Sequence, residues 1–325
     1  MLISVIIVSH NTVRLTRRCI DTVRAAIDHS SRLDDSRAEV IVVDNASSDG
    51  SVELLRQLPV KLIENQINTG FAAANNQGIA QAKGKLVMLL NSDTELDQTA
   101  LDKLIATFER HAVDETTAHL KSAGNAIDRL GIVAARLVNP DGSYQPQGGC
   151  EPSLVSLAVQ MLLLDDLPVL GKWLPSTQHT GRNWQDRPTS SGSDIHPRLE
   201  AKDWVAATAM MVRRSVFDEI GALDNNMFMY GEDIEFCLRA RHHHWDIAID
   251  HSARVLHHGS ASSSSQQAVI GELTAYRYIW AKHKPWWQLP LVAALLKTGA
   301  LLRIGLFGIL GRRQAAWYRR ALAQL

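Results

Sequence analysis

Short apolar runs and longer segments with helical spacing of apolar residues follow one another through the first hundred residues. Four short apolar runs, typical of strands buried on both faces, are residues 3–8, 40–43, 60–63 and 86–90. Between them, apolar residues recur at helical spacing over 15–27, 51–58 and 72–82. Strands that alternate with helices predict an α/β fold with a parallel sheet and crossover connections.

Polar clusters follow three of these predicted strands. They are Ser9-His10-Asn11, Asp44-Asn45 and Asn91-Ser92-Asp93. Because ligands bind at the carboxyl ends of the strands in such sheets, the clusters predict a binding site at this edge. A carboxylate at Asp93 suits Mg²⁺, which takes few protein carboxylates and completes its shell with phosphate and water. A turn or a helix cap is the alternative role for Asp44 and Asp93, and the sequence leaves both roles open.

The second half of the chain is less regular. Strand-like runs at 132–138 and 205–212 are followed by a short helical pattern that Gly221 ends. Residues 175–203 are polar and rich in Ser, Gly and Pro, which predicts a mobile loop. A later helical pattern, with Ile234, Cys237 and Leu238 on one face, has acids at its start and three histidines at its end.

Two clusters on this later helix are candidates for the chemistry: the Glu232-Asp233 pair and the histidines at 242–244. Successive residues on a helix point in different directions, so three consecutive histidines cannot hold one ion together. The helix dipole also favours cations in the last turn. The sequence therefore predicts a solvated helix end for the histidines and assigns the chemistry to the carboxylates.

Composition and charge narrow the class of protein. The chain has 325 residues and a formal net charge of zero, so nothing global indicates a nucleic-acid partner. Three distant cysteines, Cys19, Cys150 and Cys237, predict reduced thiols and no disulfide framework. The N-terminus has no basic region or long apolar core, which predicts no signal peptide. No Gly-x-Gly-x-x-Gly follows the first strand and no Walker-type glycine loop is present. The sequence therefore does not favour a nicotinamide-binding Rossmann domain or a P-loop nucleotide-binding domain.

The C-terminal segment differs from the rest in charge. No acidic residue follows Glu272, and residues 285–310 are strongly apolar although Lys297 and Arg303 interrupt them. Trp286 and Trp287 beside lysines favour a segment that lies in the headgroup region of an anionic membrane. A helical hairpin packed on the preceding domain is the alternative.

Seven segments, taken in order, resemble the family 2 glycosyltransferases, in particular their rhamnosyltransferase-like branch. The segments are SVIIVSHN, VIVVDNASSDGS, NTGFAAANNQGI, LVMLLNSDTEL, GIVAARLVNPDGS, ATAMMVRRSVFDEIGALDNNMFMYGEDIEFCLRAR and RVLHHGSAS. The resemblance implies the GT-A nucleotide-diphospho-sugar transferase fold, a mixed, mainly parallel sheet flanked by helices. We expect a catalytic domain over residues 1–260 and a helical, membrane-interfacial segment over residues 261–325.

The resemblance also implies roles for particular residues. The residues implied beside the donor nucleotide and its diphosphate are Ser9, Asn11, Asp44, Asn68, Gly70, Asn75 and Ser92. Asp93 and His257 are implied as ligands of Mg²⁺ or Mn²⁺, with His258 left open as an alternative to His257. Asn91 replaces the first acid of the family's Asp-x-Asp motif, so one anionic ligand is missing.

Asp233 is implied as the general base, and we expect its neighbour Glu232 to be a second catalytic residue that orients the acceptor or supports the loop. An aspartate with an ordinary pKa of about 3.9 is ionised at neutral pH and can take the acceptor's proton. For Glu232 and Glu235, favourable placement of acids in a first helical turn is the alternative role.

By this resemblance the chain is an inverting, metal-dependent glycosyltransferase at the cytoplasmic face of the membrane. We expect it to move L-rhamnose from dTDP-rhamnose onto a cell-envelope or polyprenyl-linked saccharide, with no nucleic-acid partner. A donor of the UDP-sugar type is one alternative, and a non-catalytic nucleotide-sugar-binding scaffold is another. A nucleotidyltransferase would need a glycine-rich triphosphate loop, which SHNTVRLTRR does not provide.

Overall fold

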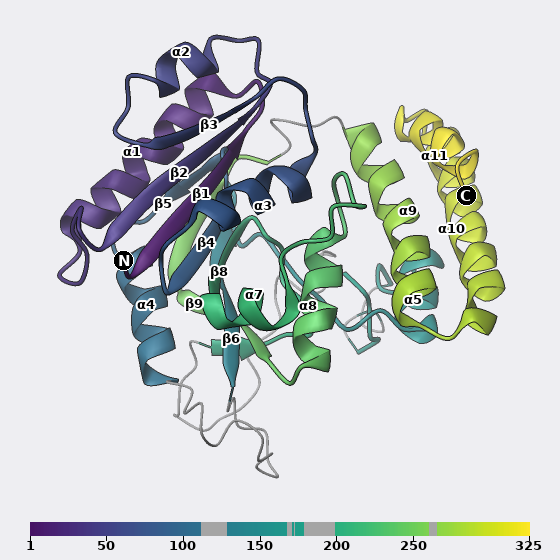
Figure 1. The fold of residues 1–325 in the computed structure, drawn as a ribbon. Coiled ribbons are helices and arrows are strands. Elements are labelled where there is room, and N and C mark those ends of the chain that lie inside the picture. Colours follow the sequence, from purple (N-terminus) through teal and green to yellow (C-terminus); the bar gives the residue numbers. More distant parts are fainter. Residues whose placement is uncertain (112–128, 168–170, 172, 179–198, 260–264) are drawn as a thin grey trace.

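The structure, a computed structural model, describes residues 1–111, 129–167, 171, 173–178, 199–259 and 265–325. The predicted domain boundary, between residues 260 and 261, lies outside the described residues. Most of the loop predicted at 175–203 also lies outside them. Figure 1 shows one large twisted sheet with helices on both faces and a group of helices at one side.

The strands are β1 (Ile3–Ser9), β2 (Ala38–Asn45), β3 (Lys61–Asn65), β4 (Leu86–Asn91), β5 (Thr94–Leu96), β6 (Leu130–Val138), β7 (Leu199–Ala201), β8 (Ala209–Arg213) and β9 (Asp246–His257). The helices are α1 (Val13–His29), α2 (Ser51–Leu55), α3 (Phe71–Gln81), α4 (Ala100–Arg110), α5 (Leu154–Met161), α7 (Arg214–Ile220), α8 (Glu232–His242), α9 (Ser265–His283), α10 (Leu289–Ile309) and α11 (Gln314–Leu322), with a 3₁₀ turn at Trp286–Gln288.

The sheet is mixed, and its long ladders are parallel. Its strand order is β3-β2-β1-β4-β8-β6-β9-β5, with β7 paired to β9. β1, β2, β3 and β4 are mutually parallel and β6 is parallel to β9, whereas the shorter ladders of β8, β5 and β7 are antiparallel. This arrangement confirms the predicted mixed sheet flanked by helices.

Apolar layers on the two faces of the sheet explain why its strands read as continuous apolar runs. Ile6 and Leu89 point to the face that α3, α7 and α8 cover, while Ile7 and Met88 point to the face that α1 and α4 cover. Side chains alternate along a strand, so a strand covered on both faces needs apolar residues at every position. Each such side chain contributes roughly 1.5–3 kcal/mol by its burial.

The same register brings the predicted strand-end clusters together. Ser9 pairs with Asp44 across β1 and β2, and Val8 pairs with Asn91 across β1 and β4. The segment before β8 joins this edge because the Asn91 N–H donates to the Thr208 carbonyl at 2.9 Å. The carboxyl ends of three parallel strands and the approach to β8 therefore bound one site.

The C-terminal helices pack on the rest of the described chain. Tyr276, Ile279 and Trp280 of α9 are buried in the same core cluster as the residues of α8. Arg303 of α10 donates to the carbonyls of Gln160 and Met161, at 2.8 Å each, and so caps the C-terminus of α5. Arg303 therefore packs within this helical group. The inner face of α10 packs on the protein, as in the alternative of a packed helical hairpin.

Candidate active site

A cavity of about 220 Å³ lies at the carboxyl edge of the parallel strands, across from the start of α8. Five of the predicted site residues line it: Ser92, Asp93, Glu232, Asp233 and His257. The strand-end side supplies Ser92 and Asp93, and α8 supplies the two other carboxyl groups. The structure therefore brings the predicted metal ligands and the predicted catalytic carboxylates to one space.

Asp93 and His257 form a pair on one wall. Oδ1 of Asp93 lies 3.3 Å from Nε2 of His257, and the other ring nitrogen of His257 lies 3.0 Å from the Gln145 side-chain oxygen. A partner on the second nitrogen fixes the orientation of an imidazole that is to bind a metal. The strand pairing Thr94–His257 between β5 and β9 sets this geometry.

The neighbouring His258 has a different partner. Its Nε2 lies 2.7 Å from Oε1 of Glu95, which also pairs with Arg18. The imidazole beside the Asp93 carboxylate is therefore that of His257.

The residues on this wall fit a divalent cation bound together with a phosphate ligand. Oδ1 of Asn91 is buried without a hydrogen-bond partner and Asn91 lines the cavity. Among the described residues, no group of three or more His, Cys, Asp or Glu side chains is placed to hold a metal. With one carboxylate, one imidazole and one amide oxygen from the protein, the remaining ligands must come from phosphate oxygens and water.

A tight turn presents the catalytic carboxylates. Tyr230 and Gly231 both have positive φ, 71° and 89°, directly before α8. A Cβ on Gly231 would lie 2.5 Å from the Ala275 Cβ, so only glycine lets the turn approach α9 this closely. Backbone strain before a pair of acids is a feature of functional sites.

Both carboxyl groups at the start of α8 have raised pKa values. Burial and the charge of Asp233 raise the pKa of Glu232 to about 8, and Oε2 of Glu232 has no hydrogen-bond partner. Burial raises the pKa of Asp233 to about 6, although the N–H groups of Ile234 and Ala207 oppose this rise. Glu232 therefore keeps its proton near neutral pH while Asp233 is mostly ionised. The pKa of Asp233 is therefore higher than the ordinary value that the sequence reasoning used, although the carboxyl group is still mostly ionised at neutral pH.

Three predicted donor residues lie on the strand-end side but do not line the cavity. Oδ1 of Asp44 accepts the Ser47 N–H at 2.9 Å, as a turn would have it, while its buried Oδ2 has no partner. The Ser9 hydroxyl bonds to Thr16. Asn11, with φ 54°, accepts the Ser48 N–H and joins the loops after β1 and β2.

Asn68, Gly70 and Asn75 do not line the cavity but support the part of its wall that Phe71 forms. Asn68 Oδ1 accepts the Gly70 N–H, and a Cβ on Gly70 would lie 2.5 Å from the Phe228 carbonyl oxygen. Asn75 donates to the Phe71 carbonyl within α3. These three residues hold the backbone of the Phe71 turn, and Phe71 itself lines the cavity.

Sequence reasoning gave no role to Asn45 and His10, which do line the cavity. The Asn45 side chain donates to Asn68 and Gly70 and accepts from Asn65 and Thr69, so it connects β2, β3 and the start of α3. His10 Nδ1 lies 2.9 Å from the Asn45 carbonyl oxygen. Both residues belong to the strand-end clusters, which was the signal available in the sequence.

The three histidines are exposed at the end of α8, as predicted. His243 lies 3.1 Å from Glu219, and His244 has φ 64°, which ends the helix. None of the three lines the cavity.

Comparisons with known proteins agree with this fold. Residues 4–129 match the family model for glycosyl transferase family 2. Among solved structures, GalNAc-T7 with UDP, GalNAc and Mn²⁺ has a TM-score of 0.59 at 16% identity, over 100% of this chain and 57% of that chain. A mannosyltransferase from Pyrobaculum calidifontis in complex with GDP-Man and Mn²⁺ has a TM-score of 0.52 at 14% identity, over 99% and 79%. The molecule is a glycosyltransferase with the GT-A fold.

The chain carries a family 2 glycosyltransferase domain, as the sequence motifs had indicated. It is similar to the N-acetylglucosaminyl-diphospho-decaprenol L-rhamnosyltransferase of Mycobacterium tuberculosis, with 26% identity over 269 residues, which are 78% of each chain. The predicted family and the predicted fold are both confirmed.

Proposed function

We propose that this glycosyltransferase is an inverting, metal-dependent enzyme that moves L-rhamnose from dTDP-rhamnose onto a polyprenyl-linked saccharide of the cell envelope. The observation that carries the proposal is one cavity that Asp93, His257, Asp233 and Glu232 line together. Such an arrangement supplies a cation-compatible diphosphate site and a proton acceptor in the same space. The similarity to an L-rhamnosyltransferase named for a decaprenol-linked substrate supports the sugar and the acceptor class.

Asp233 takes the acceptor's proton in this proposal. Inversion requires the acceptor hydroxyl to attack the anomeric carbon from the face opposite the diphosphate, and the first turn of α8 brings Asp233 to the same cavity as Asp93. Mostly ionised near neutral pH, Asp233 has a pKa close to the operating range, which suits general base catalysis. Protonated Glu232 donates a hydrogen bond that orients the acceptor.

On the donor side, Asp93, His257 and Asn91 would hold Mg²⁺ or Mn²⁺ together with the diphosphate. The cation would neutralise the charge that develops on the leaving nucleotide. Ser92 borders the nucleotide, and the unpartnered Oδ2 of Asp44 is suited to accept the imide N–H of thymine or uracil. Because Asp44 is fully buried, this contact requires the turn at Ser47 to open.

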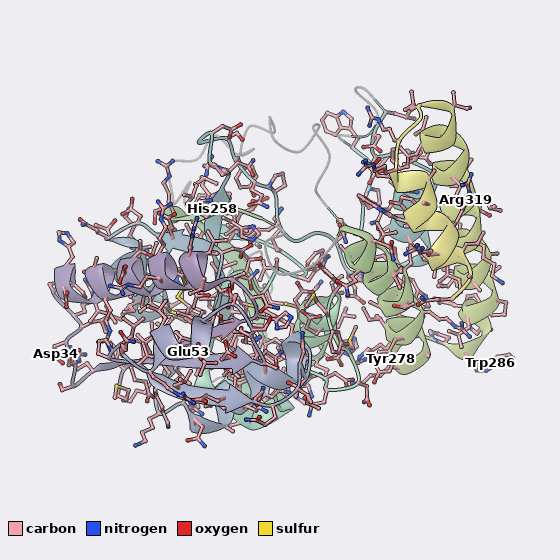
Figure 2. All side chains as sticks on the ribbon, turned by 90° about the horizontal axis from the view of Figure 1, so that it is seen from above. Asp34, Glu53, His258, Tyr278, Trp286 and Arg319 are labelled. Atoms are coloured by element: carbon pink, nitrogen blue, oxygen red, sulfur yellow. The ribbon has the colours of Figure 1, made fainter. Side chains whose placement is uncertain are left out.

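The C-terminal helices support a location at the cytoplasmic face of the membrane. Trp286–Ile309 is long and apolar enough to cross a bilayer, yet its inner face packs on α5 and α9. The outer face exposes Trp286, Trp287, Leu291, Leu301, Leu302, Leu306, Ile309 and Leu310. Trp286 lies at the far side of these helices from the sheet in Figure 2. We propose that this face lies in the headgroup region of an anionic bilayer.

A donor screen with and without metal tests the proposed reaction. We expect dTDP-rhamnose with Mg²⁺ or Mn²⁺ to raise the melting temperature and to be consumed, and EDTA to stop its consumption. Asp93→Ala should abolish turnover and the metal-dependent part of donor binding, whereas the exposed control Asp218→Asn should change neither. Full activity in EDTA would refute the metal role, and turnover of UDP-sugars alone would change the donor. Binding without any turnover would favour the non-catalytic scaffold.

Liposome co-sedimentation tests the membrane proposal. Replacing Trp286 and Trp287 with Ser should weaken binding to anionic vesicles at low salt, and added salt should weaken binding of the wild type. Trp173→Ser is a matched control because Trp173 and Trp286 have the same exposed fraction, 80%. An unmodified chain that ignores anionic vesicles at low salt would refute the proposal.

A further inference from the structure

A second cavity, of about 580 Å³, adjoins the active site on its α9 side. It lies between residues 226–230, the segment before α8, and one face of α9. Gln267, Ile270, Gly271, Thr274 and Tyr278 follow the three- and four-residue spacing of that helix face. The volume falls within the range of about 300–1,000 Å³ of small-molecule pockets. We call this cavity the α9 groove.

The α9 groove is adjacent to the catalytic cavity. Met229 and Tyr230 line both, and Glu232 of the catalytic cavity follows Tyr230 by two residues. A Cβ on Gly271 would lie 2.8 Å from the Met229 carbonyl oxygen, so the glycine lets α9 approach this segment and shapes the groove. A ligand whose reacting end lies beside Asp233 can therefore extend into the α9 groove.

The lining of the α9 groove suits hydrocarbon. None of its lining side chains carries a charge at neutral pH, and Phe228 exposes 55% of its surface there. Several of the polar groups are already engaged within the protein. The Tyr278 hydroxyl donates to Asp224 and accepts from Asn226, and the Thr274 hydroxyl donates to the Ile270 carbonyl. An alkyl or isoprenoid chain needs only apolar surface, and the side chains of Met227, Phe228, Met229, Ile270 and Ala275 supply it.

We propose that the α9 groove binds the first isoprene units of the acceptor's lipid chain, while the saccharide end lies in the catalytic cavity. This inference rests on the proposed transfer to a polyprenyl-linked acceptor and adds the place where the lipid lies. Because α9 also packs on α10, the groove leads the chain toward the helices that carry the exposed apolar face.

Matched acceptors test the proposal in the full-length enzyme. N-acetylglucosaminyl diphosphate is esterified either with a geranylgeranyl chain or with a methyl group, and KM is measured for each with dTDP-rhamnose. Thr274→Trp places a bulky ring in the groove, and Ile270→Gln exchanges an apolar wall for a polar one. Ala281→Trp, at an exposed position of α9 outside the groove, is the matched control.

We expect each groove variant to raise KM for the geranylgeranyl acceptor at least about tenfold more than KM for the methyl ester, which corresponds to 1.4 kcal/mol of selective binding. The control should leave both values unchanged. Equal changes for the two acceptors, or no change for either, would overturn the proposal.

A binding measurement separates this proposal from the proposed reaction. Geranylgeranyl diphosphate is titrated without donor and in EDTA, with inorganic diphosphate as competitor. Saturable binding that both groove variants weaken and that inorganic diphosphate does not displace supports the groove even if no rhamnose is transferred. Absent binding, or equal binding by wild type and groove variants, refutes it even if transfer occurs. Displacement by phosphatidylglycerol vesicles would assign the groove to membrane acyl chains and overturn the acceptor's lipid as occupant.

Discussion

Two carboxylate sites on α8, three residues apart, have opposite electrostatic surroundings although both are buried. Glu235 accepts hydrogen bonds from Arg239, Lys282 and His283 at 2.8–3.0 Å, and its side chain is 0% exposed. Burial alone would raise its pKa, but these donors lower it to about 2. Glu232, one turn earlier, has no cation among its partners, and its pKa is about 8. Both carboxyl groups are buried, but only Glu235 has cationic side chains beside it.

The difference separates a structural carboxylate from a chemical one. Lys282 also pairs with Asp224, so the Glu235 cluster joins α8, α9 and the segment after α7. An unpaired buried acid costs stability and gives no such connection. Where such acids persist beside a cavity, a chemical role is the better explanation.

The largest effect should follow from Asp233→Asn, which keeps the shape of the side chain and removes the proton acceptor. We expect turnover to fall by about 10²–10⁴, the range for loss of a general base, with donor affinity unchanged. In the wild type, turnover should rise through pH about 6 as Asp233 loses its proton. Single-turnover rates and donor titrations measure both quantities. Unimpaired turnover in this variant would remove Asp233 from the mechanism.

Next in size is Glu235→Gln, which leaves three cationic groups without their carboxylate. Breaking a buried ion pair at one partner costs about 3 kcal/mol, so urea unfolding should show a loss of this order. The remaining turnover, corrected for the unfolded fraction, should exceed that of Asp233→Asn. A variant as stable as the wild type would show that the cluster does not join α8 to α9.

The third effect is a change in how stability depends on pH. Native Glu232 keeps its proton up to pH about 8, whereas the unfolded chain loses it near 4.5, so the native state binds more protons across this window. The free energy of unfolding should therefore fall as pH rises from about 4.5 to about 8. Glu232→Gln should flatten this decline and gain at least about 1 kcal/mol at pH 8.

Glu235→Gln is the control for this slope because its carboxylate has the opposite shift. Its lowered pKa makes the native state bind fewer protons, so its contribution is present above pH 4.5 and is lost as pH falls toward about 2. Unfolding at pH 3, 5 and 8 distinguishes the two variants. Identical slopes for Glu232→Gln and the wild type above pH 5 would contradict the raised pKa.

The sequence predicted the elements whose own pattern decides their structure. β1, β2 and β4 are apolar at nearly every position because helices cover both faces, and α8 begins at Glu232 as its apolar spacing predicts. By contrast, the run at 205–212 is a strand only from Ala209 onward. Val205 and Ala207 are buried by packing and not in a ladder, and an apolar run does not distinguish these two situations.

β9 had no such pattern. Asp246–His257 contains Asp250, His251, Ser252 and Arg254, and its pairing with β6 has register shifts at its start and near its centre. Asp250 is buried because Thr107 and Ser252 donate to it. Partners distant in sequence make this strand, so local propensity could not predict it.

For the site, the resemblance predicted residues of both walls but not their electrostatics. The pKa of Glu232 depends on which cations α9 brings to α8, and Lys282 and His283 of α9 lie beside Glu235. Asn45 was missed because neighbouring residues at a strand end point in different directions, and sequence alone does not show which one faces the cavity.

The smallest effect should come from replacing His242, His243 and His244 together with Gln. All three are exposed, and the contacts that are lost join His243 to Glu219, whose side chain is 34% exposed, and the His242 ring to the His283 ring. Glu219 keeps the Arg129 guanidinium at 2.7 Å and the Trp245 indole N–H at 3.1 Å, so no buried charge is left without a partner. A surface pair of this kind contributes between about 0 and 1 kcal/mol. Turnover should stay within about twofold of the wild type, with the same metal requirement, because helix geometry prevents the three rings from sharing an ion. Steady-state rates at several Mn²⁺ concentrations measure this. If the triple variant lost metal-dependent turnover while Asp233→Asn kept it, the chemistry would belong to the histidines, and the contrast between the two carboxylate sites on α8 would concern folding alone.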